Sequence, residues 1–198
     1  ISSLKKIISS HNIKTKINKK FFIDEQFDTS QPKSLYGFTK LASESLIKEF
    51  NLSNGLKFII NRFGVVAGPW QFGKTDQGFV SLWCWNYLNK KNMKYIGFGG
   101  YGHQVRDILH IDDLCDILLI QIKKFTKING QTFNISGGNK NSISLRETSA
   151  FLSNILNTKL KFKAVPKTSI YDIPYYVGNN KKVKKFYNWQ PKKNIKDI

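Results

Sequence analysis

Apolar residues recur every three to four positions between Leu35 and Phe50, which is the spacing of one face of an α-helix. The segment 51–55 contains two asparagines and a glycine and is expected to end this helix. The run 56–61 (LKFIIN) is short, apolar and rich in branched side chains, which predicts a buried strand. A helix followed by a buried strand is typical of layered α/β proteins.

Helices and strands continue to alternate along the rest of the chain. Ser144 and Glu147 match a capping box, in which each side chain hydrogen-bonds the backbone of the other residue at a helix start. Residues 1–33 are polar and irregular, with one short helix expected over 4–8. The alternation predicts an α/β fold with less regular pieces after residue 70. The other predicted elements are helices at 78–88, 112–124 and 144–156, and strands at 93–96, 104–110 and 131–136.

The composition indicates a folded protein without a membrane span. Of the 198 residues, 40% are hydrophobic and 14% aromatic, which is too much apolar material for a disordered polyelectrolyte. No window of about 18 residues lacks charge, so no membrane partner is expected. The net charge is +19, but only three of the 32 basic residues are arginines. Readers of nucleic acid rely on arginine, so we interpret the excess as lysine on solvated faces and do not expect a nucleic-acid partner.

The cysteines and the start of the chain bear on its location. Cys84 and Cys115 are the only cysteines, which excludes a disulfide framework and a four-thiolate metal site. Both are expected to be small buried hydrophobes, and no metal site is expected. No secretory signal is visible, so a cytoplasmic location is expected. Because the sequence begins with Ile1, we expect a piece of a longer protein.

The clearest chemical pattern is Tyr36 with Lys40. Residues four apart on a helix lie on the same face, one turn from each other. A free phenol is a poor base at neutral pH, but an ammonium about 4 Å from a phenolate contributes about 4 kcal/mol at an effective dielectric of about 20. The spacing therefore suits an activated tyrosine that takes a proton. The same pair is common on solvated helices, so the interpretation needs a second feature and an adjoining cleft.

Two further motifs supply that second feature. Residues 62–69 (RFGVVAGP) follow the strand after the helix, and residues 104–114 (QVRDILHIDDL) come about forty residues later. With the YxxxK of the helix, they resemble the RxxNxxGP and VRDxxHVxDL segments of the extended short-chain dehydrogenase/reductase family. This family contains NAD-dependent nucleotide-sugar epimerases and dehydratases. The stretches SLYGFTKLASE and AGPWQFGKTDQGF look closest to the branch that epimerises CDP-sugars at carbon 2, of the CDP-paratose (tyvelose) type.

The resemblance implies a fold and a division into domains. The fold would be α/β, with the C-terminal part of a Rossmann-type parallel sheet and a small α+β substrate-binding domain. Residues 1–70 would be the remainder of the NAD-binding domain. Residues 71–198 would be mainly the substrate-binding domain, with some segments returning to the Rossmann sheet. The chain would be the C-terminal two-thirds of an N-terminally truncated enzyme, a homodimer when full length.

The resemblance also implies roles for individual residues. Tyr36 would be the catalytic base that takes a proton from the sugar, and Lys40 would assist it and hold the NAD ribose. The reaction would be an epimerisation through transient NAD-dependent oxidation of the sugar. The substrate would be a nucleotide-diphosphate sugar, with a CDP-sugar favoured. Val66 and Pro69 would lie near the cofactor. Arg106 would bind the diphosphate of the substrate. The other residues expected to contact the substrate are Gln71, Asp76 and Gln77.

The sequence departs from the family pattern at several points. Too few residues precede Tyr36 to contain the dinucleotide-binding fingerprint, so the isolated chain is expected to be inactive. Ser9 and Ser10 lie at the distance of the family's catalytic Ser or Thr but are interpreted as surface serines. Val65 replaces the usual Asn, which fits the 2-epimerase branch. Ser169 stands where an arginine often holds the diphosphate, which predicts reduced substrate affinity.

Several other patterns are given structural interpretations. The segment 97–102 matches G-x-G-x-x-G, but a strand is expected after it, so we interpret it as a glycine turn near the substrate nucleotide and not as a cofactor fingerprint. His110 is interpreted as structural and Asp112 as the N-cap of the next helix. The tryptophans that flank the 78–88 helix are expected to be core residues: Trp70, Trp83 and Trp85.

Two alternative functions remain open at this point. A nucleotide-sugar dehydratase or reductase would use the same scaffold and differ only around the sugar. A non-catalytic polyanion- or RNA-binding relative is suggested by the charge of +19 and by Ser169.

Overall fold

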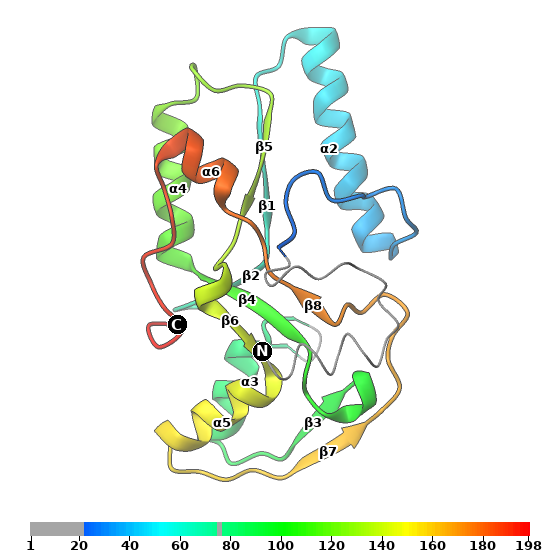
Figure 1. Cartoon of the computed structure of the whole chain (residues 1–198), viewed down its shortest axis with the longest axis vertical. Helices are drawn as coiled ribbons and strands as arrows, with labels where there is room; N and C mark the ends of the chain where they lie inside the picture. Colours follow the sequence, from blue (N-terminus) through cyan, green and yellow to red (C-terminus); the bar gives the residue numbers. More distant parts are fainter. Residues whose placement is uncertain (1–21, 75–76) are drawn as a thin grey trace.

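Two parallel strands with helices on both sides form the upper part of the computed structural model, which describes residues 22–74 and 77–198. The strands are β1 (Ile59–Phe63) and β5 (Gln131–Ile135), paired with Ile59 opposite Gln131. Figure 1 shows α2 (Leu35–Asn54) on one side of this pair, and α4 (Ile111–Lys123) and α6 (Lys181–Tyr187) on the other. The buried core lies on the α4 and α6 side; its fully buried members include Phe133, Ile135, Ile117 and Val183.

Strand β4 (Val105–His110) is the centre of the second sheet. It pairs in parallel with β2 (Val65–Ala67) and β8 (Tyr175–Tyr176), and antiparallel with β6 (Ser142–Ser144). Asp107 is fully buried in β4, and its Oδ2 accepts hydrogen bonds from the backbone N–H groups of Gly178 (2.9 Å) and Gly138 (3.2 Å). One carboxylate therefore joins β4 to the loops after β5 and β8.

The lower part of the molecule has its own core. Strand β3 (Met93–Ile96) pairs in parallel with β7 (Phe162–Val165), next to helices α3 (Phe79–Leu88) and α5 (Leu145–Ile155). Trp83 and Tyr87 of α3 pack there with Met93. Two short 3₁₀ helices complete the described elements: η1 (Phe98–Gly100) and η2 (Asn139–Asn141).

Most predicted elements are present, with shifted ends. Helix α2 continues to Asn54, four residues beyond the predicted periodicity, and Gly55 ends it in the left-handed conformation. The following strand begins at Ile59 and not at 56, because the loop before it is bound by side chains: Asn51 donates to the Leu56 carbonyl, and Asn129 accepts from the Phe58 N–H. The capping box at the start of α5 is confirmed. Reading the sequence missed the short strands β2, β6, β7 and β8 and the helix α6.

Some predictions about single residues are wrong. Trp83 is buried as expected, but Trp70 and Trp85 are exposed. Cys115 is also exposed, because it lies on the outer face of α4, and Cys84 is only partly buried. The N-cap of α4 is His110, whose Nδ1 accepts from the Asp112 N–H at 3.1 Å, so the structural interpretation of the histidine is confirmed and Asp112 is not the cap.

The glycine-rich segment 97–102 forms η1 and its flanking turns and does not open an α-helix. A side chain at Gly100 would meet the backbone of Ala164 in β7, and φ there is +75°, so only glycine suits this close approach. The prediction of a glycine turn is therefore confirmed. Within the described residues, no helix is long and apolar enough to cross a bilayer. The predicted helix at 4–8 and the serines Ser9 and Ser10 lie outside the described residues.

Candidate functional site

Tyr36 and Lys40 lie together on the first two turns of α2. Ser34 caps this helix, with its Oγ accepting from the Gly37 N–H at 3.1 Å, and the cap fixes where the helical spacing begins. The Lys40 ammonium lies 5.3 Å from the centre of the Tyr36 ring. Tyr36 is 66% exposed. The structure thus places both groups on one open face, as the spacing predicts.

A cleft of about 220 Å³ adjoins this face. Lys40 lines it from α2, Arg62 from β1 and Tyr176 from β8. Glu44, one turn after Lys40, also lines the cleft and forms a two-point ion pair with Arg62: Nε to Oε1 is 2.8 Å and Nη2 to Oε2 is 2.6 Å. This ion pair raises the pKa of Arg62 and joins α2 to β1. The ion pair therefore fixes two of the residues that line the cleft, Glu44 and Arg62, next to Lys40.

Tyr176 is a cleft residue that the sequence reading missed. Burial raises the pKa of Tyr176 to about 12, and the nearby Asp107 carboxylate adds to the effect. Its phenol therefore stays protonated at neutral pH and can donate a hydrogen bond but cannot act as a base. The only signal in the sequence is a pair of tyrosines after Pro174, which periodicity cannot assign to a cleft.

The loop after β2 is held by one of the predicted substrate residues. Val66 lies in β2, one residue after Val65, which stands at the Asn position of the RxxNxxGP pattern, and Pro69 follows in the turn. Gln71 donates from Nε2 to the Val66 carbonyl at 2.8 Å and accepts at Oε1 from the Ser81 Oγ at 3.0 Å. Its amide thus ties the loop to α3. Gln77 lies exposed at a turn, and Asp76 lies outside the described residues.

Arg106 lies in β4, next to Tyr176 in the register of β8. Its Nη2 is 2.9 Å from Asp172 Oδ1, and its Nη1 donates to the Val105 carbonyl at 2.9 Å. Burial lowers the pKa of Arg106, and the charge of Asp172 opposes that shift. Arg106 does not line the cleft that Lys40 lines. The structure therefore brings Lys40 to both Tyr36 and the cleft, but Tyr36 itself does not line the cleft. Arg106, the residue predicted to bind the diphosphate, lies outside the cleft and is linked to it through its pairing with Tyr176.

The described residues offer no alternative metal chemistry at this site. Across residues 22–74 and 77–198, no group of three or more His, Cys, Asp or Glu side chains could hold a metal ion. The chemical options of the site are proton transfer by a phenol beside an ammonium, hydrogen bonding by a neutral tyrosine, and anion binding by an arginine.

Comparison with known proteins places this arrangement in a family. Residues 8–136 match the model of the NAD dependent epimerase/dehydratase family. The chain is 32% identical over 174 residues to a CDP-paratose 2-epimerase of Salmonella typhi, which covers 87% of this chain and 50% of that protein. It is 26% identical to UDP-glucuronate 4-epimerase 2 of Arabidopsis thaliana, over 88% of this chain and 42% of that protein.

The fold is likewise shared with solved structures. A UDP-glucuronic acid 4-epimerase from Bacillus cereus, solved with UDP-glucuronic acid and NAD, superposes with a TM-score of 0.77 and 22% identity. The match covers 91% of this chain and 55% of that one, which confirms the predicted Rossmann-type α/β fold. The chain spans about half the length of the relatives that it matches, less than the two-thirds expected from the sequence. The matching family model, the similar relatives and the shared fold show that this chain belongs to the NAD-dependent epimerase/dehydratase family.

Proposed function

We propose that this chain is the catalytic and substrate-binding half of a nucleotide-sugar epimerase that uses NAD. The observation that carries the proposal is the Lys40 ammonium at 5.3 Å from the ring of an exposed Tyr36, with Lys40 also lining a cleft. Membership of the family and the 32% identity to a CDP-paratose 2-epimerase support the same reaction class.

In this proposal, Tyr36 is the general base. Its phenolate takes the proton from a sugar hydroxyl, and the Lys40 ammonium stabilises the negative charge on the ring oxygen. The exposure of both side chains leaves room for a sugar and a ribose to approach from the open side of α2. Protonated Tyr176 donates a hydrogen bond from the far wall of the cleft and does not compete for the proton.

In this proposal, residues of this chain hold the part of NAD that the sugar must meet. Lys40 would hold the nicotinamide ribose, and the backbone from Val66 to Pro69 would border the ring. The cofactor, when bound, supplies a reversible hydride acceptor for one sugar carbon. Gln71 orients this border, because its amide spans the Val66 carbonyl and Ser81 of α3. Arg106 would bind the substrate diphosphate with its planar fork, in exchange for part of its contact with Asp172.

We propose a CDP-sugar as the substrate and carbon 2 as the site of inversion. Support comes from the CDP-paratose 2-epimerase relative and from Val65 at the position where the family usually has Asn. UDP-glucuronate 4-epimerases also match, so a UDP-sugar is the competing substrate. A dehydratase on the same scaffold is the second candidate reaction, because a dTDP-glucose 4,6-dehydratase from Bacillus anthracis shares the fold with a TM-score of 0.74.

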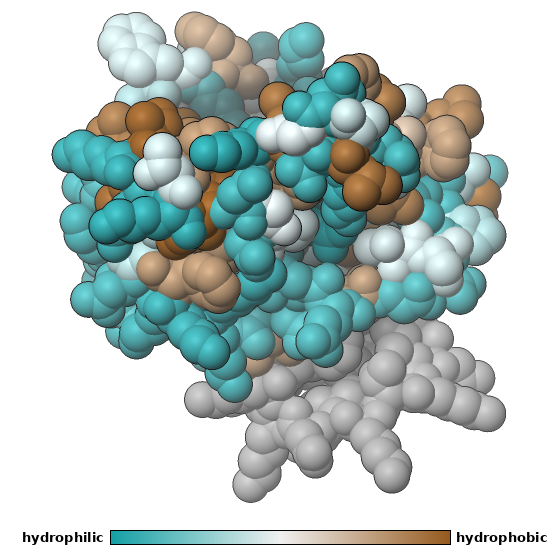
Figure 2. Space-filling model, turned by 90° about the horizontal axis from the view of Figure 1, so that it is seen from above, coloured by the Kyte–Doolittle hydropathy of each residue, from teal (hydrophilic) through white to brown (hydrophobic). Residues whose placement is uncertain are grey.

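We further propose a homodimer in the cytoplasm, with α2 at or near the contact. Helix α2 has no fully buried residue, and several of its large apolar side chains are exposed. Figure 2, which looks onto the molecule from above, shows hydrophobic patches set among hydrophilic side chains. The rest of the sheet in a full-length enzyme, or a second copy of the protein, would cover this apolar face of α2. The exposed apolar residues of α2 are Leu35, Phe38, Leu46, Phe50 and Leu52.

The test uses an enzyme of family length. In this hybrid enzyme, the first half of the Salmonella typhi CDP-paratose 2-epimerase precedes this chain. Incubation with a CDP-2-epimer pair and with UDP-glucuronic acid, followed by chromatography of the sugars, distinguishes the reactions. Inversion of the CDP-sugar at carbon 2 supports the proposal. Inversion of UDP-glucuronic acid alone, or a dehydrated product, would replace it with the corresponding alternative.

A further inference from the structure

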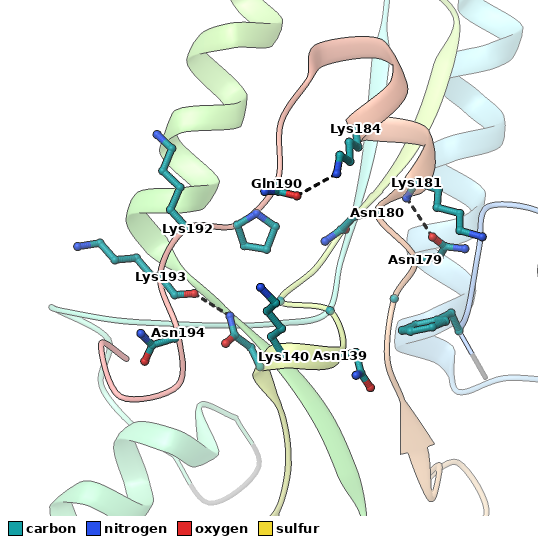
Figure 3. A pocket seen from close by; sticks show the side chains of 16 residues that line it. Asn139, Lys140, Asn179, Asn180, Lys181, Lys184, Gln190, Lys192, Lys193 and Asn194 are labelled. Atoms are coloured by element: carbon teal, nitrogen blue, oxygen red, sulfur yellow. Dashed lines mark hydrogen bonds between the residues drawn. The ribbon is translucent and has the colours of Figure 1, made fainter. Parts of the chain in front are cut away.

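A second and larger cavity lies at the carboxyl end of β5, away from Tyr36 and Lys40. Its volume is about 540 Å³, within the range of small-molecule sites, and it shares no lining residue with the cleft at Lys40. Figure 3 shows its walls: η2 and the glycine loop before it, helix α6, and the C-terminal segment after Gln190. We call this cavity the lysine pocket, after five of its lining residues: Lys140, Lys181, Lys184, Lys192 and Lys193.

The charge of the lysine pocket is not explained by the composition of the chain. Five of its sixteen lining residues are lysines, whereas about one residue in seven of the whole chain is lysine. None of the sixteen is Asp or Glu. A concave surface lined by one sign of charge concentrates field lines and attracts ions of the opposite sign. The pocket therefore favours an anion.

The ammonium groups of the pocket lysines differ in whether their charge is neutralised by a neighbouring side chain. Lys192 is neutralised, with its Nζ 3.0 Å from Asp116 Oδ2. Lys184 donates to Gln190 Oε1 at 3.2 Å, and because that amide is neutral, the charge is not cancelled. Figure 3 shows Lys140 and Lys184 reaching from opposite walls toward the space between them. These two lysines are the pair best placed to hold one ligand from two sides.

The walls of the pocket are fixed by buried contacts. The buried Asp113 carboxylate accepts from the backbone N–H groups of Lys192 (3.0 Å) and Lys193 (2.9 Å), which holds the C-terminal segment against α4. The Asn180 side chain forms two hydrogen bonds with the backbone of Ser136. Its Oδ1 accepts from the Ser136 N–H at 3.0 Å, and its Nδ2 donates to the Ser136 carbonyl at 2.7 Å. A fixed frame lowers the cost of ordering the pocket around a ligand.

One buried polar atom at the pocket lacks a partner. Asn141 is 2% exposed and lines the pocket, and its Nδ2 donates to the Lys193 carbonyl at 2.9 Å. Its Oδ1 has no hydrogen-bond partner among the described residues. A buried acceptor without a partner costs free energy, and a ligand hydroxyl or amine would satisfy it. The unpaired Asn141 Oδ1 therefore points to a ligand independently of the lysines.

We infer that the lysine pocket is a second ligand site, which binds a small molecule that carries a diphosphate group and hydroxyls. Lys140 and Lys184 hold the diphosphate from two sides, and Asn141 accepts a hydrogen bond from a hydroxyl. The site is separate from the proposed sugar site, because the two cavities have no residue in common.

The test measures binding of pyrophosphate to the purified 198-residue chain by isothermal titration calorimetry at low ionic strength. The double variant Lys140→Gln/Lys184→Gln should weaken binding roughly tenfold, since it removes two ion contacts at the surface. The matched control Lys127→Gln/Lys163→Gln loses the same charge at exposed positions outside the pocket and should stay within about twofold. Circular dichroism confirms that both variants fold.

Four results would overturn the inference. One is the absence of pyrophosphate binding by the unchanged chain at millimolar concentration. Another is equal weakening by both double variants, which would indicate diffuse attraction by the net charge. The third is loss of binding in Lys40→Gln with retention in Lys140→Gln/Lys184→Gln, which would place the anion in the cleft of α2. The last is equal binding of single-stranded RNA to all variants without any binding of pyrophosphate. This result would indicate a general polyanion-binding surface and not a pocket.

Discussion

Glu44 and Arg62 join the helix that carries the proposed base to the strand beneath it. The two hydrogen bonds between them, of 2.8 and 2.6 Å, are the charged link between α2 and β1. Because α2 has no fully buried residue, this link helps to hold Lys40 beside the cleft. The proposed catalytic face is thus linked to the sheet by an ion pair between residues that are eighteen positions apart in the chain.

Replacement of Glu44 by Gln should therefore loosen α2. The partly buried guanidinium of Arg62 would lose its charged partner, and we expect the free energy of unfolding to fall by roughly 1–3 kcal/mol. Urea denaturation followed by tryptophan fluorescence measures the change. Glu49→Gln, which alters an exposed carboxylate on the same helix, is the control and should change stability by less than about 0.5 kcal/mol. Equal stability of the two variants would contradict the role of the ion pair.

Asp107 should make the stability of the chain depend on pH. Burial raises the pKa of Asp107 in the folded chain, so the folded state binds its proton more readily than the unfolded chain does. Its contribution to stability is therefore largest at low pH and is lost as the pH rises through the folded-state pKa. Asp107→Asn removes this titration. The free energy of unfolding of the unchanged chain, minus that of the variant, should increase as the pH falls from 7 toward about 4.

Denaturation of both proteins across that pH range tests the assignment. The subtraction cancels the other titrating groups, because they are the same in the two chains. A difference that stays constant, or that shrinks as the pH falls, would show that the hydrogen bonds from Gly138 and Gly178 outweigh the burial of the carboxylate.

Arg106 should affect substrate binding more than the chemical step. In the hybrid enzyme, Arg106→Lys keeps a positive charge but loses the planar fork that can bind a diphosphate and Asp172 together. We expect KM for the CDP-sugar to rise roughly tenfold, with kcat changed by less than about threefold. Steady-state kinetics give both values, and Arg146→Lys in α5 is the control. A fall in kcat at constant KM would assign Arg106 to the reaction itself.

The sequence predicted those features that depend on local spacing. The helical periodicity that begins at Leu35 places Tyr36 and Lys40 on one face, and the capping box at Ser144 marks the start of α5. Both follow from interactions within one or two helical turns. The short strands β2 and β8 were missed because two or three residues carry no periodicity, and each forms through its pairing with the distant strand β4.

The rest of the site depends on contacts that no local pattern reveals. Tyr176 reaches the cleft because β8 pairs with β4, and Gln71 turns to the Val66 carbonyl instead of facing outward. The lysine pocket combines α6 with η2, whose residues are some forty positions apart. In each case the partner is set by tertiary packing.

In the proposed reaction, Tyr36, assisted by Lys40, takes the proton from the sugar. The most direct test is the turnover of the CDP-sugar by the hybrid enzyme with Tyr36→Phe, which removes only the phenolic oxygen. We expect turnover to fall by at least about 100-fold, with NAD binding nearly unchanged in an equilibrium titration. Turnover within about twofold of the unchanged hybrid enzyme would contradict the account.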